Sequence, residues 1–215
     1  MKREGFKSIF TKAVLAGIMI GIGGTIYLCT DNKYIGSLLF SLGLFTILRY
    51  EFALYTGKVG YIPERPAAYI RDVLITLLGN VVGTGIIAGI IRLTRVGVTV
   101  HQQALLVMEA KTGDSLISQM LLGVLCGLLM YIAVDNGKRC TRDNKDASFV
   151  FGTTIPVMVF ILCGFNHSIA DCFYLFAAVE TPAMVVSGTL YILTVACGNA
   201  IGGMLIPFTG KMFDK

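Results

Sequence analysis

Long apolar segments make up most of this chain, and they decide what it can fold into. Six can be counted, at residues 9–30, 34–62, 70–91, 116–134, 147–179 and 184–208. A bilayer core needs about 20 helical residues for each crossing. Because 55% of the residues are hydrophobic and only 14% are charged, a water-soluble domain could not bury this much apolar surface. The sequence therefore predicts an all-α membrane protein with six transmembrane helices, in a single transmembrane domain over residues 1–215.

The basic residues predict how the chain lies in the membrane. They gather before the first segment (Lys2, Arg3, Lys7 and Lys12), after the second and fourth segments and in the tail, whereas the other connections hold few. By the positive-inside rule, this pattern predicts a multi-pass protein of the cell (plasma) membrane with both termini in the cytoplasm. The net charge is +5, but the basic residues lie between the apolar segments and form no patch in which basic and aromatic residues alternate. We therefore expect membrane lipid, and no nucleic acid, among its partners.

Two of the segments are interrupted by polar residues and glycine. The second contains "RYEFALYTGK" at residues 49–58, and the fifth contains "CGFNHSIAD" at residues 163–171. Each is followed by a segment with the pattern G-N-x-x-G, in "LLGNVVGTG" at 77–85 and "ACGNAIGGM" at 196–204. Glycine is common in membrane helices, so a single match could arise by chance. Two matches in corresponding positions favour an internal repeat.

Each half of the chain thus has a whole span, then a broken span, then a span with the G-N-x-x-G pattern. The second half repeats this order three spans after the first. Since three is odd, the second copy enters the membrane from the opposite side. We expect an inverted repeat of three plus three helices, over residues of about 9–91 and 116–208, in which helices 2 and 5 are broken. Such repeats are a recurrent transport architecture, with the substrate site near the midplane between the breaks.

The second break holds the sharpest candidate for a functional residue. Irregular backbone at membrane depth persists only where it is buried in protein or lines a path. His167, next to Asn166, lies at such a place, and histidine can donate a hydrogen bond or a proton near neutral pH. The alternative is a core histidine satisfied by a neighbouring backbone group. Asp171 can cap the following half-helix or pair with Arg49.

These residues resemble the formate/nitrite transporter family. "GFNHSIAD" is similar to the family's G-F-x-H-S-x-A-N signature, with Asp171 in place of the usual asparagine, and "LYTGK" at residues 54–58 is similar to its L-F-T-[GS] segment. The G-N-x-x-G spans match as well, and the resemblance covers nearly the whole chain. "YTGKVGY" is closer to the hydrosulfide-channel branch than to the formate branch. The resemblance implies an aquaporin-like six-helix protomer, a homopentamer and one pore in each protomer.

The resemblance also assigns roles, motif by motif. It places His167 at the central pore histidine, Thr56 at the threonine of the first break, and Lys111 at a lysine of the outer end of the fourth helix. With Asn166, these form the expected substrate pathway. The expected constriction residues are Leu54, Phe160, Phe40 and Leu44. The last two depend on an ungapped register through "RYEFAL", where Glu51 lies three residues before Leu54 and the family's acid lies immediately before the leucine.

The expected function is passage of small monovalent anions of weak acids, such as formate, nitrite, hydrosulfide and short carboxylates. One charge at mid-membrane costs roughly 3 kcal/mol or more. Lys111 and the half-helix dipoles would gather the anion, Thr56 and His167 would offer hydrogen bonds, and a proton would accompany it through the apolar constrictions. Without the resemblance, the favoured interpretation of Lys111 is a solvated loop lysine or one that extends its charged end to the membrane interface.

Other classes of protein fit the sequence less well. An aquaporin-like channel for small neutral solutes is the nearest alternative, but Asn80 and Asn199 do not begin N-P-A motifs. A membrane enzyme is not expected, because neither G-x-S-x-G nor H-E-x-x-H occurs and neighbouring residues alone do not make a catalytic triad. With only two histidines, we expect no metal site, and we expect no cofactor. The polar breaks argue against a scaffolding protein without transport.

Overall fold

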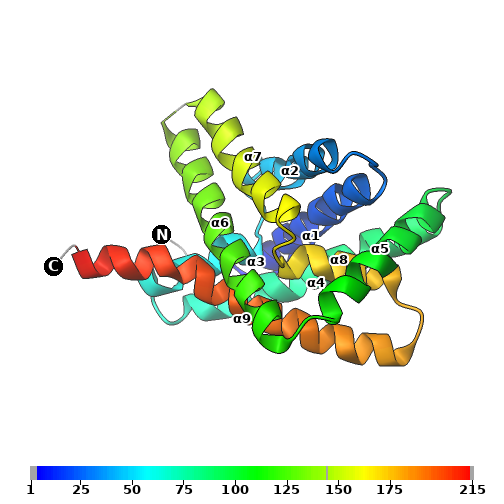
Figure 1. Ribbon diagram of the computed structural model, residues 1–215. Coiled ribbons are helices and arrows are strands. Elements are labelled where there is room, and N and C mark those ends of the chain that lie inside the picture. The colour runs from blue at the N-terminus through cyan, green and yellow to red at the C-terminus, as the bar shows by residue number, and fades with distance from the viewer. Residues whose placement is uncertain (1–3, 144, 214–215) are drawn as a thin grey trace.

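The computed structural model describes residues 4–143 and 145–213, and these residues form helices joined by short connections, without a strand (Figure 1). The prediction of an all-α protein is confirmed. Lys2 and Arg3, which contribute to the predicted orientation, lie outside the described residues.

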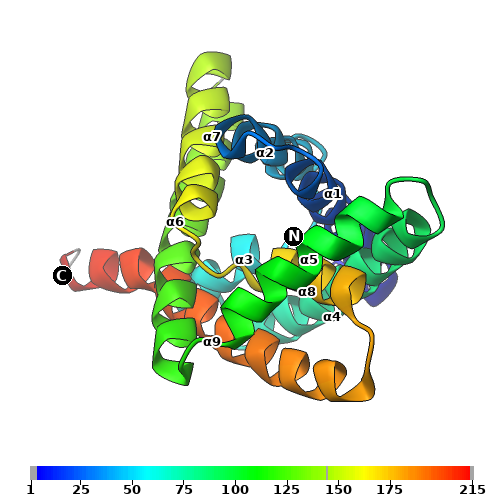
Figure 2. The ribbon, with the colours of Figure 1, turned by 45° about the vertical axis from the view of Figure 1, so that its right-hand side comes forward.

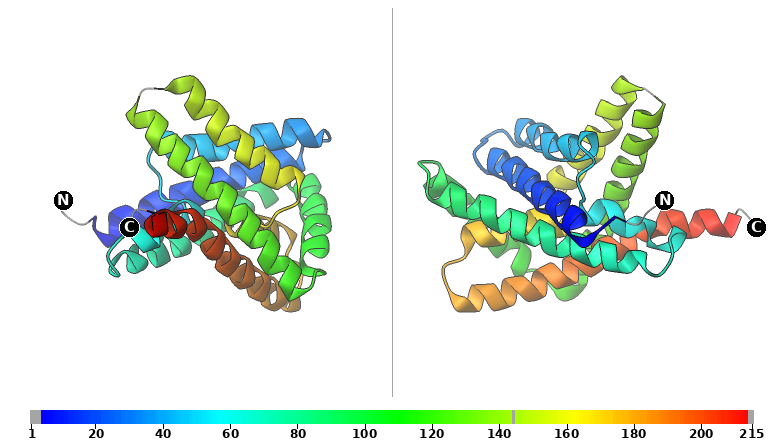
Figure 3. Two further views of the ribbon diagram at one scale, coloured as in Figure 1. Left: turned by 60° about the vertical axis from the view of Figure 1, so that its left-hand side comes forward. Right: turned by 180° about the vertical axis from the view of Figure 1, so that it is seen from behind.

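Four helices of the described residues are long and apolar enough to cross a membrane. They are α1 (Phe6–Leu28), α4 (Tyr69–Arg92), α6 (Leu116–Arg142) and α9 (Pro182–Phe213). They pack in two pairs, α1 with α4 and α6 with α9 (Figure 3). Glycines permit this close packing: a Cβ atom at Gly17 of α1 would collide with the backbone of Asn80, and one at Gly127 of α6 with the backbone of Asn199. Small residues let helices approach where lipid gives no hydrophobic drive for association.

The two interrupted segments each fold as separate shorter helices. The first gives α2 (Lys33–Arg49), the single turn α3 (Tyr55–Lys58) and the 3₁₀ helix η1 (Val59–Glu64). The second gives α7 (Asp146–Leu162) and α8 (Ser168–Ala178). Non-helical residues 50–54 and 163–167 separate the parts, so the chain leaves the helix where the sequence places its polar interruptions.

Both interruptions begin with the same backbone turn. The amide of Phe52 donates to the carbonyl of Ile47, and the amide of Phe165 donates to that of Phe160, at 2.8 Å in each case. This six-to-one bond closes a helix end when the residue before the donor is left-handed. That residue is Gly164 in the second interruption, with a φ of +69°, and Glu51 in the first, with a φ of +53°. Glycine takes this conformation freely, whereas Glu51 gives up about 1 kcal/mol to do so.

One helix, α5 (Gly97–Thr112), is not among the six segments expected from the sequence. Its buried residues are Gly97, Val100, Ala104 and Met108, which recur every three or four positions and form a narrow apolar stripe. A search for long apolar runs misses such a helix. α5 packs along α8 (Figure 2).

α5 runs antiparallel to α8 and contacts both of its ends. At the C-terminal end of α8, Nδ1 of His101 donates to the carbonyl of Ala177 at 2.8 Å, and its Nε2 lies 2.9 Å from a carboxylate oxygen of Glu180. At the N-terminal end, Lys111 in the last turn of α5 contacts Asn166 and Asp171. α5 is therefore a brace that spans the whole of α8.

Candidate functional site

Two asparagines hold the two interruptions in the same way. Oδ1 of Asn80 accepts from the amide of Tyr55, the first residue of α3, and its Nδ2 donates to the carbonyls of Ala53 and Ala13, at 2.7–2.8 Å. Because Ala13 belongs to α1, Asn80 joins α4, the first interruption and α1. Buried backbone groups that would otherwise lack partners are thus satisfied.

Asn199 repeats this arrangement in the second half of the chain. Its Oδ1 accepts from the amide of Ser168, the first residue of α8, at 2.9 Å. Its Nδ2 donates to the carbonyls of Asn166 and Gly123, at 2.9 and 2.8 Å. Both asparagines are fully buried. The asparagine of the G-N-x-x-G pattern is therefore the residue that fixes each interruption, a role the sequence analysis missed although it found the pattern.

His167 lies at the N-terminus of α8, and its ring has a defined hydrogen-bonding state. Nδ1 accepts from the backbone amide of Ala170 at 3.2 Å, which caps the helix. An amide can only donate, so Nδ1 carries no proton and the neutral ring carries its proton on Nε2. Nε2 lies 3.1 Å from Oγ1 of Thr56 and donates to it. The two interruptions thus meet through one hydrogen bond between buried side chains, each 1% exposed.

Aromatic rings cover one face of this histidine. The ring of Phe160 stacks on His167 with centroids 5.4 Å apart, and Phe40 packs edge-on against Phe160 at 6.1 Å. Leu44 lies one turn after Phe40 on α2, and Leu54 is the residue before α3; both are buried. The structure therefore brings His167, Thr56, Phe160 and Phe40 together and packs Leu44 and Leu54 in the same core.

A cavity of about 290 Å³, here named the Lys111 cavity, opens on one side of this cluster. Its wall includes Lys111, Asn166, His167, Phe160 and Asp171. Nζ of Lys111 donates to Oδ1 of Asn166 at 2.8 Å. All of the predicted pathway residues except Thr56 line this one cavity.

A second cavity of about 580 Å³, here named the Lys58 cavity, lies on the other side. Leu54 and Gly57, on either side of Tyr55 and Thr56 in the chain, are part of its wall. Basic side chains are prominent among the rest, together with two carboxylates: Lys12, Lys58, Arg65, Lys138, Glu4 and Glu51. Hydrogen bonds from Lys12 and Ser8 hold the pKa of Glu4 below its usual range. Thr56 and His167 thus lie between two cavities, one with several basic residues in its wall and the other with Lys111.

Helices α1 and α6 run in opposite directions between the cavities. α1 begins near the Lys58 cavity, where Lys12 is part of the wall, and reaches the Lys111 cavity at Tyr27. α6 begins near the Lys111 cavity, which Leu122 lines, and reaches the Lys58 cavity at Val134.

The structure corrects two expectations about charged residues. Asp171 does not pair with Arg49, which is exposed at the end of α2; instead it lies 3.2 Å from Nζ of Lys111 and accepts from the hydroxyl of Tyr191 at 2.7 Å. Lys111 lies in the last turn of α5, and not at the outer end of the fourth apolar segment. The reason is the same in both cases: the unpredicted helix α5 carries Lys111 to the start of α8.

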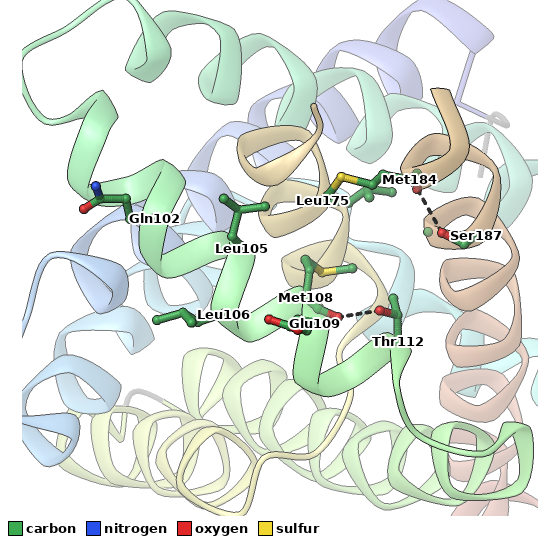
Figure 4. Close-up of a pocket in the computed structure, with 10 residues that line it drawn as sticks. Gln102, Leu105, Leu106, Met108, Glu109, Thr112, Leu175, Met184 and Ser187 are labelled. Carbon is green, nitrogen blue, oxygen red and sulfur yellow. Dashed lines mark hydrogen bonds between the residues drawn. The ribbon is translucent and has the colours of Figure 1, made fainter. Parts of the chain in front are cut away.

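A larger groove of about 630 Å³ lies on a different side of α5 and holds none of the predicted site residues (Figure 4). Its apolar lining includes Leu105, Met108 and Met184, and its polar lining includes Glu109 and Gln102. Size alone therefore does not mark the functional site. Buried polar side chains are concentrated instead around His167.

Apolar helices long enough to cross a membrane, together with interrupted helices that meet at a buried polar cluster between two cavities, define a class: membrane transport proteins with a site inside the helical bundle. Comparison with known proteins gives the family. The model of the formate/nitrite transporter family matches residues 2–213. The chain therefore belongs to the formate/nitrite transporter family, and the resemblance stated from the sequence is confirmed.

Individual relatives are distant but cover most of the chain. The formate channel FocB of Escherichia coli K12 is 24% identical, over 93% of this chain and 84% of its own length. The formate channel FocA of the same strain is 26% identical, over 92% and 82%. Among solved structures, a pentameric formate channel with formate bound matches with a TM-score of 0.75 at 23% identity, over 97% and 96%. An ion channel of the FNT family matches with a TM-score of 0.80 at 20% identity, over 97% and 90%.

Proposed function

We propose that this protein is a membrane channel or transporter for small monovalent anions of weak acids, a class that includes formate, nitrite, hydrosulfide and short carboxylates. Membership of the formate/nitrite transporter family supports the proposal, as do relatives that are named formate channels. The observation that carries it is the hydrogen-bonded pair of His167 and Thr56, buried between the Lys111 cavity and the Lys58 cavity.

In the proposed pathway, an anion enters the Lys111 cavity, passes His167 and Thr56, and leaves past Leu54 into the Lys58 cavity. Lys111 and Asn166 meet the anion first. Phe160, Phe40, Leu44 and Leu54 provide the apolar constrictions, which exclude water and so make a bare charge costly. A proton that travels with the anion removes most of this cost.

The protonation state of His167 defines what it can supply. As a neutral ring with its proton on Nε2, it offers a hydrogen bond to an anion that replaces Thr56 as the acceptor. To release a proton it would first have to become an imidazolium, and a proton on Nδ1 would break the bond that caps α8 at Ala170. We therefore infer that His167 holds and orients the anion. The accompanying proton comes from water of the cavity that the anion enters, where the hydroxide stays, and it returns to water in the opposite cavity.

The membrane arrangement is part of the proposal. α2 with α3, and α7 with α8, are the broken spans 2 and 5, which completes six spans with the four long helices. The opposite directions of α1 and α6 and the equivalent bonds of Asn80 and Asn199 support an inverted repeat over residues of about 9–91 and 116–208. The Lys58 cavity and both termini face the cytoplasm, and five copies form a homopentamer.

The proposal is tested by uptake of formate, nitrite and hydrosulfide into proteoliposomes under a pH gradient. Two substitutions separate the roles of His167. His167→Asn retains a cap for α8 but removes the imidazole, and His167→Phe retains the stacking on Phe160 but removes every hydrogen bond. We expect both to lower anion flux by at least about tenfold, since a hydrogen bond to a charged group is worth about 1.5–3 kcal/mol.

Two results would contradict the proposal. Unchanged and still pH-dependent flux in both variants would refute the role of His167. Wild-type liposomes that conduct water or glycerol but move none of the three anions faster than empty liposomes would favour an aquaporin-like channel instead.

A further inference from the structure

Asp171 is a buried carboxylate in the wall of the Lys111 cavity, and the proposed pathway gives it no role. It lies in the first turn of α8 and is 1% exposed. Oδ1 is 3.2 Å from Nζ of Lys111, and Oδ2 accepts a hydrogen bond of 2.7 Å from the hydroxyl of Tyr191. Both oxygens thus have a donor, and the N-terminus of a helix favours negative charge. The surroundings therefore suit the ionised carboxylate.

Asp171 changes what Lys111 can offer to an anion in the cavity. An ammonium group has three N–H donors. Asn166 takes one, at 2.8 Å, and Asp171 takes another, so one remains for a ligand. The side chain of Lys111 is only 16% exposed, and its charge is compensated before any anion arrives.

We propose that Asp171 sets the affinity of the Lys111 cavity for anions, as an internal counter-ion with which a permeating anion must share the Lys111 ammonium group. This inference rests on the proposed function and deepens it. A pathway must bind its solute strongly enough to admit it and weakly enough to let it leave. A lysine without Asp171 would hold anions longer. The paired lysine attracts them less and releases them sooner.

The decisive variant is Asp171→Asn, which keeps the shape and a hydrogen-bond acceptor but removes the negative charge. We expect the formate concentration for half-maximal uptake to fall about tenfold, with a lower maximal rate, because the unopposed ammonium group holds the anion. Added salt should reduce the gain, because ions screen the attraction. In the double variant Lys111→Met with Asp171→Asn, the gain should disappear.

Glu109→Gln is the matched control. Glu109 lies on the same helix as Lys111, two residues before it, and the substitution makes the same change in charge. Its side chain is exposed at the groove on the other side of α5 (Figure 4). We expect the half-maximal concentration to change by less than about twofold, because water and ions screen the effect of an exposed charge on an anion in the Lys111 cavity. A shift as large as that of Asp171→Asn would overturn the proposal, because general electrostatics would then suffice.

Tyr191→Phe tests the same idea in the opposite direction. Without the hydroxyl, the charge of Asp171 is directed more strongly to Lys111, so the half-maximal concentration should rise about two- to threefold. This variant keeps the proposal testable if Asp171→Asn does not fold. The proposal would be overturned if every one of these two variants that folds had the same half-maximal concentration as wild type.

Failure of this inference is distinguishable from failure of the proposed function. If the wild-type protein transports formate and Asp171→Asn has the same kinetics, only the counter-ion is wrong. If the wild-type protein transports no anion, binding is measured instead, as the rise in melting temperature that sodium formate gives over sodium gluconate at equal ionic strength. A larger rise for Asp171→Asn than for wild type would support the counter-ion, and an equal rise would overturn it.

Discussion

At the scale of single residues, the hydrogen bond between His167 and Thr56 is the central contact. It joins side chains 111 positions apart in the sequence, and the cap at Ala170 sets its direction from the imidazole to the hydroxyl. Thr56 therefore uses its acceptor on His167 and keeps its own proton free for a solute. In the proposed pathway, an anion at this point receives one hydrogen bond from each residue.

This direction predicts different effects for two substitutions of Thr56. Thr56→Val keeps the shape but removes the hydroxyl that would donate to the anion, so we expect anion flux to fall about tenfold. Thr56→Ser keeps the hydroxyl and should stay within about twofold of wild type. Uptake of formate into proteoliposomes measures both. Equal flux in the valine and serine variants would mean that the hydroxyl has no part in passage.

Residues of this cluster differ in how well the sequence could predict them. Short motifs fix the neighbours of His167 and Thr56 in the chain, whereas Phe40 depends on an assumed register through residues 49–54; the structure places all three in one buried cluster with Phe160. The partners of Lys111 were not found: Asp171 was expected to cap a helix or to pair with Arg49, and Tyr191 was not considered. Contacts among α5, α8 and α9 depend on tertiary packing, which no local pattern encodes.

At the scale of elements, each interruption is a helix end, a short extended stretch and a new helix start, held by one asparagine. Asn80 and Asn199 each satisfy one amide and two carbonyls. The position of each break is therefore determined by the local sequence, which ends the first helix, and by an asparagine of a distant helix, which binds the non-helical backbone. Two such anchors fix the backbone where the half-helices meet.

Removal of either anchor should be costly. In Asn80→Ala or Asn199→Ala, one buried amide and one buried carbonyl at the interruption lose their partner, and each loss costs about 1–3 kcal/mol. We expect a fall in melting temperature in detergent far larger than that of Asn136→Ala, the control. Asn136 donates to the carbonyl of Ser148 near the surface, at 3.1 Å. A similar melting temperature for all three variants would show that the anchors contribute little.

The elements themselves were only partly predictable. The long helices follow from hydropathy, and the positions of the two interruptions follow from polar residues and glycine. α5 was missed because its apolar stripe is narrow and its sequence carries many polar residues. The single turn α3 and the 3₁₀ helix η1 were also beyond local reasoning, since Pro63 and Gly60 would argue against a regular helix there.

At the scale of the whole molecule, much apolar surface remains uncovered in a single chain. Along α4, Leu74, Leu78, Val82, Ile86 and Ile90 recur every four residues and are exposed. Such a face suits lipid or a neighbouring copy of the chain. The apolar groove between α5 and α9 adds further uncovered surface away from the pathway.

If the proposed homopentamer is right, the protein in a mild detergent should have five times the mass of one chain. Native mass spectrometry measures this directly, with light scattering as a check on the detergent contribution. Because each protomer has its own pair of cavities, the pentamer should contain five separate pathways. A monomer that retains full anion flux would contradict a need for assembly.

Helix α5 is a place where a reagent outside the cell could act on the site. In the proposed orientation it lies away from the cytoplasm, and it touches α8 at His101 and again at Lys111. A nanobody that lifts this helix would withdraw the ammonium group from Asn166 and Asp171 together. Conduction could then be silenced by a reagent that never enters the lipid or the pore.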